Sequence, residues 1–157
     1  MELAERSESN HLNLQHGENI IIRLTYISCY NTSNANIEVA RILEQARRNN
    51  ERNGITGALV INESYFLQVI EGSRPIINAL LQKLVNDDRH FSLSIVECHE
   101  IEQRRWSKWS MQYLKPSDGN KEDVLKFSSS ATFNPYLMSA TQIRLFIEAL
   151  SKHQEEQ

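Results

Sequence analysis

The stretch ITGALVINESYFLQVIEG, residues 55–72, decides how this chain folds. Two apolar runs, 55–61 and 65–72, are separated only by Asn-Glu-Ser, a pattern that predicts two antiparallel strands joined by a tight connection. One residue does not suit a purely apolar strand, because Gln68 stands in the middle of the second run. A carboxamide donates and accepts hydrogen bonds, so this side chain requires polar partners in the interior.

Strand and helix patterns continue on both sides of this hairpin. Upstream, residues 20–28 alternate as in a strand, with Tyr26 on the apolar face, and residues 36–52 show helical spacing. Asn53-Gly54 ends that helix, because glycine readily takes the left-handed conformation that follows a helix C-terminus. Downstream, Ser73 is the expected N-cap of a second helix, with Pro75 in its first turn.

Two further strands complete the pattern. Residues 93–101 predict a fourth strand, and residues 109–114 predict a fifth, in which Trp109, Met111 and Tyr113 share one face. The order is strand, helix, strand, strand, helix, strand, strand. It predicts an α+β fold of the ferredoxin-like kind, a five-stranded mixed sheet with two helices on one face.

The two ends of the chain differ from this unit. We expect residues 1–19 to form a flexible arm, residues 20–115 to form the domain and residues 116–157 to form a helical extension. In the extension, residues 122–130 predict a short helix, and Ser-Ala-Thr-Gln from Ser139 predicts a capping box that opens a longer one. About 40 residues cannot form an independent core, so the extension should pack on the sheet or on a partner.

Composition excludes several classes of protein. The net charge of −3 argues against a nucleic-acid-binding protein, and no apolar run is long enough to span a membrane. The N-terminal stretch lacks the apolar core of a secretory signal. Cys29 and Cys98 form no disulfide framework, and two reduced thiols suit a cytoplasmic protein.

Enzyme signatures are also missing from the sequence. It contains no G-x-S-x-G elbow, no P-loop and no Rossmann glycine fingerprint, so we expect no enzymatic activity. The Cys98-His99 pair lacks spaced partners, so we expect no metal. Tyr26, Gln68 and Met111 fall on apolar faces, where each taken alone is also compatible with a structural role.

Taken together, five segments carry a resemblance. LTYIS (24–28), NNERNGITGALV (49–60), YFLQVIEG (65–72), DDRHF (87–91) and WSMQYL (109–114) resemble, in order and spacing, the BLUF domain. BLUF proteins are blue-light receptors that bind FAD noncovalently on a ferredoxin-like fold. The resemblance covers residues 20–114, and the tail is similar to that of short BLUF proteins without an enzymatic output domain.

The resemblance implies a flavin site between the two helices. It places Tyr26, Gln68 and Met111 beside the polar edge of the ring, with Asn50 bridging N3–H and O4 and Asn49 supporting either that edge or the O2 side. Matching positions imply further contacts on both faces of the ring and near the ribityl–phosphate portion. They are Ile42 and Leu84 for the ring, Leu84 replacing an isoleucine often found there, and Lys83, Arg89 and His90 for the phosphate end.

The resemblance also implies a light-driven mechanism. Tyr26 would give an electron and a proton to the excited flavin, and Gln68 would relay the proton and then rearrange its amide by rotation or tautomerisation. A stronger hydrogen bond to flavin O4 would move absorption to the red. Met111 and Trp109 would transmit the change to the fifth strand and the C-terminal helices, although Trp109 is equally compatible with a structural core position.

The expected output is contact with a downstream regulatory protein, and a homo-oligomer is expected, with no direct nucleic-acid or membrane partner. Two alternatives remain at this point. One is a non-photoactive binding module on the same fold, and the other is a small flavoenzyme. A yellow purified protein would argue against the first, and a reversible spectral change on illumination would argue against the second.

Overall fold

The computed structural model describes residues 19–30, 35–115 and 121–155. The predicted N-terminal arm therefore falls almost wholly outside the described residues, and residues 116–120, which open the predicted extension, fall outside them entirely. The elements follow the predicted order. They are β1 (Ile21–Tyr30), α2 (Ala35–Asn53), β2 (Thr56–Ile61), β3 (Tyr65–Ser73), α3 (Arg74–Val85), β4 (His90–Ile101), β5 (Gln112–Tyr113), α4 (Lys121–Phe127), the 3-10 turn η2 (Pro135–Leu137) and α5 (Ala140–Glu155).

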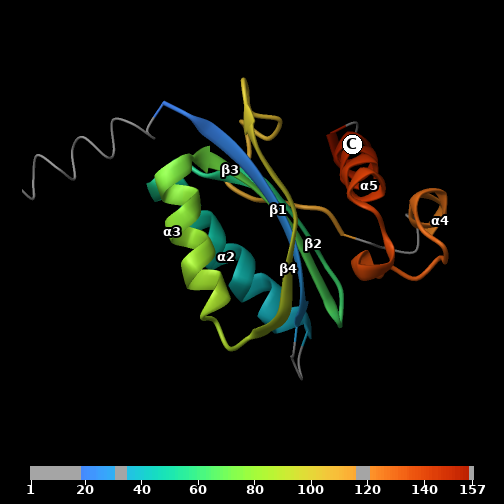
Figure 1. The fold of residues 1–157 in the computed structure, drawn as a ribbon. Helices are drawn as coiled ribbons and strands as arrows, with labels where there is room; N and C mark the ends of the chain where they lie inside the picture. Colours follow the sequence, from blue (N-terminus) through green and yellow to red (C-terminus); the bar gives the residue numbers. More distant parts are fainter. Residues whose placement is uncertain (1–18, 31–34, 116–120, 156–157) are drawn as a thin grey trace, which may run out of the picture.

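The strands form one sheet in the order β4-β1-β3-β2-β5. All neighbours are antiparallel except β2 and β5, which are parallel, so the sheet is mixed as predicted. Helices α2 and α3 cover one face of this sheet, which is the ferredoxin-like α+β arrangement (Figure 1). In the three central strands, Tyr26, Gln68 and Leu59 lie in one row across the sheet.

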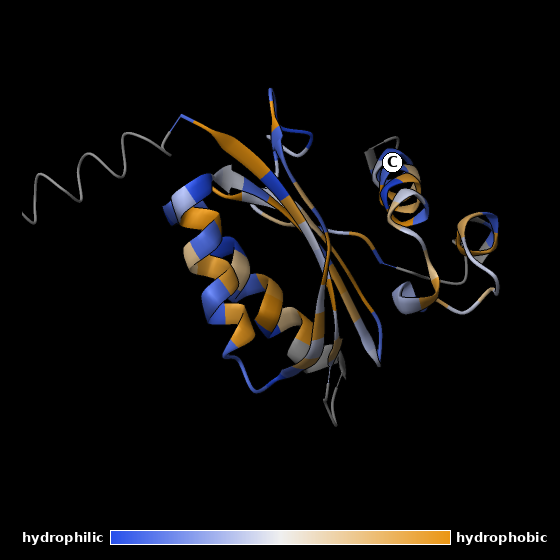
Figure 2. Cartoon of the chain, in the orientation of Figure 1, coloured by the Kyte–Doolittle hydropathy of each residue, from blue (hydrophilic) through white to orange (hydrophobic). Residues whose placement is uncertain are grey.

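Hydrophobic residues make up much of the strands (Figure 2), and because successive side chains point to opposite faces, the sheet has two apolar faces. The face under α2 and α3 carries Leu24, Tyr26 and Ile70, together with Ile42 and Ile77 from the helices. The opposite face forms a second core with residues of the C-terminal extension. That core contains Ile27, Ala58, Val60, Leu67, Val69, Trp106, Leu114, Val124, Phe133, Met138, Ile143, Phe146, Ile147 and Leu150.

The C-terminal extension packs on the sheet, one of the two placements expected for it. Helix α5 begins with the predicted capping box, in which Ser139 N–H donates to Gln142 Oε1 (2.8 Å) and Gln142 N–H donates to Ser139 Oγ (3.1 Å). Its apolar stripe is buried, and Phe146 is 0% exposed. The extension therefore shares a hydrophobic core with the sheet.

One local prediction, the extent of the fifth strand, is wrong. The fifth strand contains only two residues, and Trp109 and Met111 precede it, with Trp109 40% exposed while Met111 is 1% exposed. Helix α2 explains the shortening, because Asn50 Nδ2 donates to the Ser110 carbonyl (2.7 Å) and Arg47 Nε to that of Met111 (3.1 Å). Ser73 is the N-cap of α3 as predicted, with Pro75 in the first turn, although the Ser73 side chain makes no capping hydrogen bond.

Within the described ranges, none of the helices combines the length and apolarity that crossing a membrane requires.

Candidate functional site

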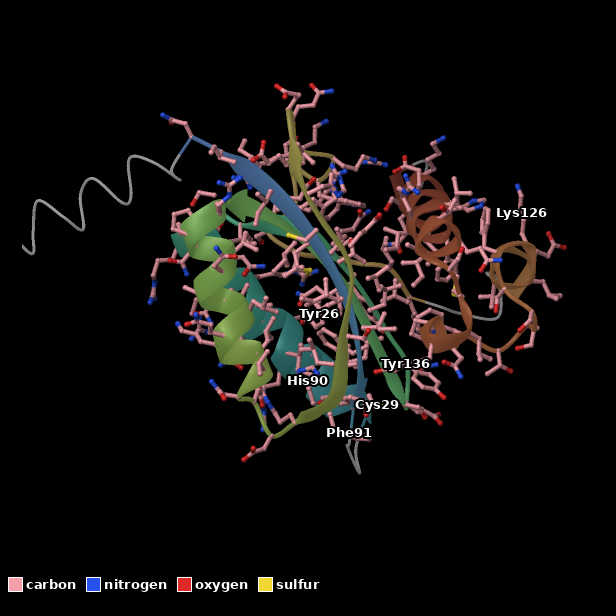
Figure 3. All side chains as sticks on the ribbon, viewed as in Figure 1. Tyr26, Cys29, His90, Phe91, Lys126 and Tyr136 are labelled. Carbon is pink, nitrogen blue, oxygen red and sulfur yellow. The ribbon has the colours of Figure 1, made fainter. Side chains whose placement is uncertain are left out.

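A cavity of about 220 Å³ opens between the sheet and the helices α2 and α3. In Figure 3, Tyr26 and His90 lie on this helix-covered side, whereas Tyr136 lies on the opposite side of the sheet. Strands β1 and β3 form the floor, the two helices form the walls, and the turn into β4 forms one end. The lining residues are Tyr26, Ile42, Gln45, Ala46, Asn49, Asn50, Phe66, Gln68, Leu80, Lys83, Leu84, Asp87, Arg89 and His90.

The floor of the cavity holds a chain of three side chains. Tyr26, which is 0% exposed, donates its phenolic hydrogen bond to Gln68 Oε1. At the other end of the amide, Gln68 Nε2 donates to the Met111 sulfur at 3.6 Å. A carboxamide nitrogen carries two hydrogens, so Gln68 retains one donor for a ligand.

Burial has a clear effect on the phenol. It raises the pKa of Tyr26 well above its ordinary value, and the negative charge of Asp87 adds to this. Tyr26 is therefore neutral at physiological pH, and its O–H is available as a donor. Both ends of the buried Gln68 amide therefore have polar partners, because its oxygen accepts from a phenol and its nitrogen donates to a thioether.

The C-terminal end of α2 contributes a second carboxamide. Asn50 is 3% exposed and uses one amide hydrogen on the Ser110 carbonyl, so its Oδ1 and the other hydrogen remain for a ligand. Asn49 is exposed beside it at the cavity. Asn50 thus joins the cavity to the segment that carries Met111.

The outer end of the cavity is charged. Lys83 and Arg89 are exposed there, and Arg89 pairs with Asp87 at 2.7 Å. The side-chain hydrogen bond from Arg89, supported by its charge, lowers the pKa of Asp87 to about 2, although burial opposes this. Two cations against one carboxylate leave this end positive, which suits an anionic group.

His90 closes the same end from the sheet side. Its Nδ1 lies 2.9 Å from Ser28 Oγ, and its ring meets Phe66 edge-on with 4.7 Å between centroids. Burial lowers the pKa of His90, with Arg89 acting in the same direction and Asp87 against it. His90 is therefore a neutral hydrogen-bonding group at pH 7.

The structure brings together every predicted cofactor-binding residue except Met111 in the lining of this cavity. Met111 lies behind Gln68 and contacts its amide rather than the cavity. Trp109 lies outside the site, half-exposed in the β4–β5 loop.

Five lining residues were missed by the sequence reasoning. Ala46 and Leu80 are one helical turn from the predicted Ile42 and Leu84, so helical spacing could have found them. Phe66 lies two residues before Gln68 and therefore on the same strand face, so the alternation of side chains could have found it. Gln45 is one helical turn before the predicted Asn49, so the same spacing could have found it, and Asp87 lies in the segment DDRHF beside the predicted Arg89 and His90.

The chemistry of this lining fits a flat heteroaromatic cofactor with a phosphate tail. Ile42, Leu80 and Leu84 offer apolar contact to the faces of a ring, Gln68 and Asn50 offer donors and an acceptor to its edge, and the cationic end suits phosphate. Among the residues that the structure describes, no group of three His, Cys, Asp or Glu side chains is arranged to hold a metal ion.

Comparison with known proteins gives a family match. The family described as "BLUF: Sensors of blue-light using FAD" matches residues 21–112, which is more than half of the chain. Among curated proteins, the blue light- and temperature-regulated antirepressor BluF of Escherichia coli is 26% identical over 89 residues, 57% of this chain and 22% of that protein. The chain spans between about a tenth and a fifth of the curated relatives it matches.

Solved structures agree with this match. The photo-activated state of BlsA superimposes with a TM-score of 0.75 at 28% identity, covering 83% of this chain and 94% of that one. The dark state of BlrB, described as a BLUF protein, gives a TM-score of 0.61 at 27% identity, covering 71% and 81%.

Proposed function

The chain belongs to the BLUF family of blue-light sensors that use FAD, and from this premise we propose that it is a photoreceptor whose switch is the Tyr26–Gln68 pair. The single observation that supports the switch is the buried chain Tyr26–Gln68–Met111, in which one amide is held by a phenol at one end and a thioether at the other.

The lining residues have distinct roles in holding FAD. Ile42 and Leu84 would pack on the two faces of the ring, and Asn50 and Gln68 would hydrogen-bond its polar edge, with Asn49 beside them. Lys83, Arg89 and His90 would face the ribityl–phosphate portion, where positive charge and a neutral imidazole donor both suit phosphate oxygens.

Bound FAD supplies absorption of blue light and an excited state that accepts an electron. Tyr26 is the donor, because its phenol lies against Gln68 in the floor of the cavity. In darkness the raised pKa of Tyr26 keeps the proton on Oη. Loss of an electron makes a phenol strongly acidic, so the proton then passes to Gln68 Oε1, which already accepts the hydrogen bond.

Gln68 could then exchange the positions of its donor and acceptor ends, and return of the electron and a proton to Tyr26 would leave a rearranged amide with no net redox change. When the amide nitrogen no longer faces Met111, the thioether loses its hydrogen-bond donor and must repack, which a flexible methionine does at low cost. The carbonyl of Met111 is held by Arg47 and that of the preceding residue by Asn50, so a shift here reaches α2 and the β4–β5 loop.

We propose that this change is passed to a regulatory protein through light-dependent contact, with no enzymatic step in this chain. The relative in Escherichia coli is named an antirepressor, which supports an output of this kind. The cytoplasm is the proposed location, and self-association is part of the proposal.

The test is absorption spectroscopy of the purified chain loaded with FAD. We expect blue light to shift the flavin band to the red without bleaching it, and darkness to restore the original spectrum. Free FAD under the same lamp is the control and should show no such shift. Lasting bleaching that requires an added substrate would favour a flavoenzyme, and a chain that binds no FAD would refute the proposal.

A further inference from the structure

A buried carboxylate lies on the face of the sheet opposite the cavity and has no role in the proposed flavin site. Glu71 lies on β3, three residues after Gln68, and is 0% exposed. Successive side chains of a strand point to opposite faces of the sheet, and positions 68 and 71 are an odd number of residues apart. The side chain of Glu71 therefore projects from the face that α5 covers, opposite the cavity. Burying a carboxylate is costly unless it is well paired, so its surroundings carry information about its role.

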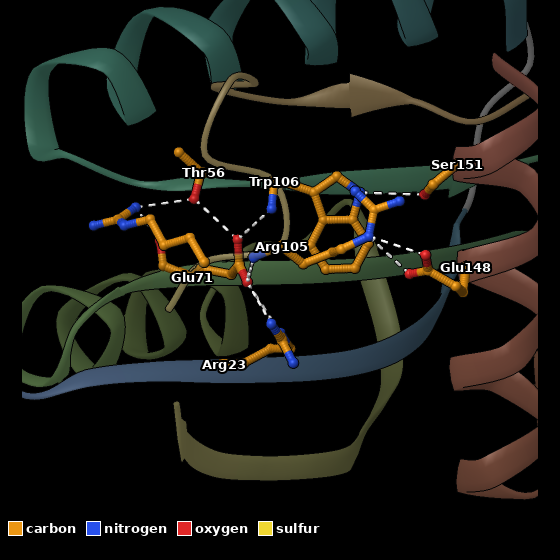
Figure 4. Close-up of polar contacts among 8 residues, drawn as sticks. Arg23, Thr56, Glu71, Arg105, Trp106, Glu148 and Ser151 are labelled. Carbon is orange, nitrogen blue, oxygen red and sulfur yellow. Dashed lines mark hydrogen bonds and ion pairs between the residues drawn. The ribbon is translucent and has the colours of Figure 1, made fainter. Parts of the chain in front are cut away.

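The carboxylate of Glu71 accepts five hydrogen bonds (Figure 4). Arg23 donates two of them, from Nε (3.0 Å) and Nη2 (2.8 Å), and Thr56 Oγ1 donates a third (3.1 Å). The other two come from consecutive backbone N–H groups, those of Arg105 and Trp106, both at 2.9 Å. The β4–β5 loop is thus attached to β3 by its main chain.

The same two loop residues hold α5 with their side chains. Arg105 Nε donates to both carboxylate oxygens of Glu148 (2.8 and 3.1 Å), and Trp106 Nε1 donates to the buried Ser151 Oγ (3.2 Å). Residues 148 and 151 are three apart and face the same way on the helix. The guanidinium groups of Arg23 and Arg105 lie 5.7 and 5.5 Å from the Trp106 ring centroid, so both make cation–π contacts with the indole.

Glu71 holds the middle of the β4–β5 loop, and the last residue of this loop, Met111, contacts Gln68. We propose that Glu71 is a positioning residue for the light response: it holds residues 105–106 so that movement at Met111 is transferred to α5 through the Arg105–Glu148 and Trp106–Ser151 contacts. This inference rests on the proposed function of the Tyr26–Gln68 switch. It assigns the output to one helix and names the contacts that carry it.

The first test removes the α5 side of the connection. Glu148→Ala combined with Ser151→Ala eliminates both contacts and leaves Glu71, the loop and the cavity unchanged. In the FAD-loaded full chain, amide hydrogen exchange of residues 140–155 should change at least about threefold on illumination, and the double variant should lose that change while keeping the red shift.

Arg144→Gln is the matched control on the same helix. Arg144 lies 3.8 Å from Glu97 of β4 and takes no part in the Glu71 contacts, so this variant should keep the light-dependent exchange. A double variant that keeps the full light-dependent change in α5, or a parent chain that shifts to the red without any change in α5, would overturn the inference.

The second test concerns the positioning role itself. Glu71→Gln keeps the shape of the side chain but replaces one acceptor oxygen with a donor, so it cannot accept from both loop N–H groups. We expect an unchanged size of the red shift but a dark-recovery rate altered by about tenfold, because the segment leading to Met111 is no longer held. Glu100→Gln, which removes an exposed ion pair with Arg74, is the control and should recover normally.

These results separate the two proposals. If the parent chain binds FAD but shows no red shift, the Tyr26–Gln68 switch fails. If the red shift is normal and recovery is unaffected in Glu71→Gln, only the positioning role fails. Should Glu71→Gln not fold, the double variant in α5 still decides the matter, since neither of its residues contacts Glu71.

Discussion

Gln68 shows how a single polar residue in an apolar strand identifies a site. Its burial could be predicted from the alternation of side chains along the strand. Its need for polar partners follows from the free-energy cost of an unpaired buried amide. The partners themselves come from β1 and the β4–β5 loop, more than 40 positions away in each direction of the chain. No local pattern specifies such contacts, so the sequence indicates a site without showing what completes it.

Gln112 is a second buried glutamine, and the surroundings of its amide differ from those of Gln68. It is 1% exposed, and among the described residues neither its Nε2 nor its Oε1 has a hydrogen-bond partner. Replacing it with a methionine of similar shape should raise the free energy of unfolding by about 1–3 kcal/mol in chemical denaturation, since the unpaired amide is removed. Gln82→Met, at an exposed site on α3, should change it by less than about 0.5 kcal/mol. Destabilisation by Gln112→Met would mean that the amide is satisfied.

His90 predicts a pH dependence of stability. Burial lowers its pKa in the folded state, whereas in the unfolded chain the pKa is about 6.5. The unfolded state therefore binds the proton first, so stability is complete above pH 6.5 and falls as the pH drops toward the lowered value. Denaturation of the FAD-free protein at pH 7.5 and 5.5 should show this loss, and His90→Gln should reduce it. An equal loss in the variant would exclude His90 as its source.

At the scale of elements, the helices and four strands could be predicted because their periodicity is long and their ends carry clear signals. The extent of the fifth strand could not, because the carbonyls of Ser110 and Met111 just before it are taken by Asn50 and Arg47, which lie some 60 residues earlier. Other distant contacts explain why Trp106 rather than Trp109 enters a core. The sequence offers two tryptophans three residues apart, and only the contacts with Glu71 and Ser151 select between them.

Gly57 is the most constrained position of the β2–β3 hairpin. A Cβ there would lie 2.1 Å from the Val69 carbonyl oxygen, a contact with rigid backbone. Gly57→Ala should therefore lower the free energy of unfolding by about 3 kcal/mol or more. Gly54→Ala is the matched control, because its Cβ meets nothing within 4 Å and only its φ of +67° is unfavourable, at a cost of about 1–2 kcal/mol. Equal effects in the two variants would contradict the described hairpin.

At the scale of the whole molecule, the sheet is covered on both faces. The sequence predicted the helices on one face from their order and left the position of the extension open between the sheet and a partner. An amphipathic stripe shows that a helix must bury one side, but it does not specify against what. The structure places α5 on the second face, so the proposed flavin site and the proposed output helix lie on opposite sides of one sheet, with β3 contributing to both.

This arrangement predicts that the extension unfolds together with the sheet. Phe146→Ala removes a fully buried ring from the shared core and should lower the free energy of unfolding of the whole chain by about 3–5 kcal/mol. Leu145→Ala, at the neighbouring position that is 48% exposed, should cost less than about 1 kcal/mol. If Phe146→Ala splits unfolding into two transitions and leaves the second unshifted, the extension would be an independent unit.

The account depends most directly on the phenol at position 26, so the decisive measurement is the light-induced spectrum of Tyr26→Phe loaded with FAD. Tyr30→Phe is the matched control, a buried tyrosine of the same core whose backbone N–H pairs with the carbonyl of Ser64, four residues before Gln68. We predict that Tyr26→Phe retains FAD but shows no red shift, while Tyr30→Phe shifts and recovers. A normal, reversible red shift in Tyr26→Phe would contradict the account.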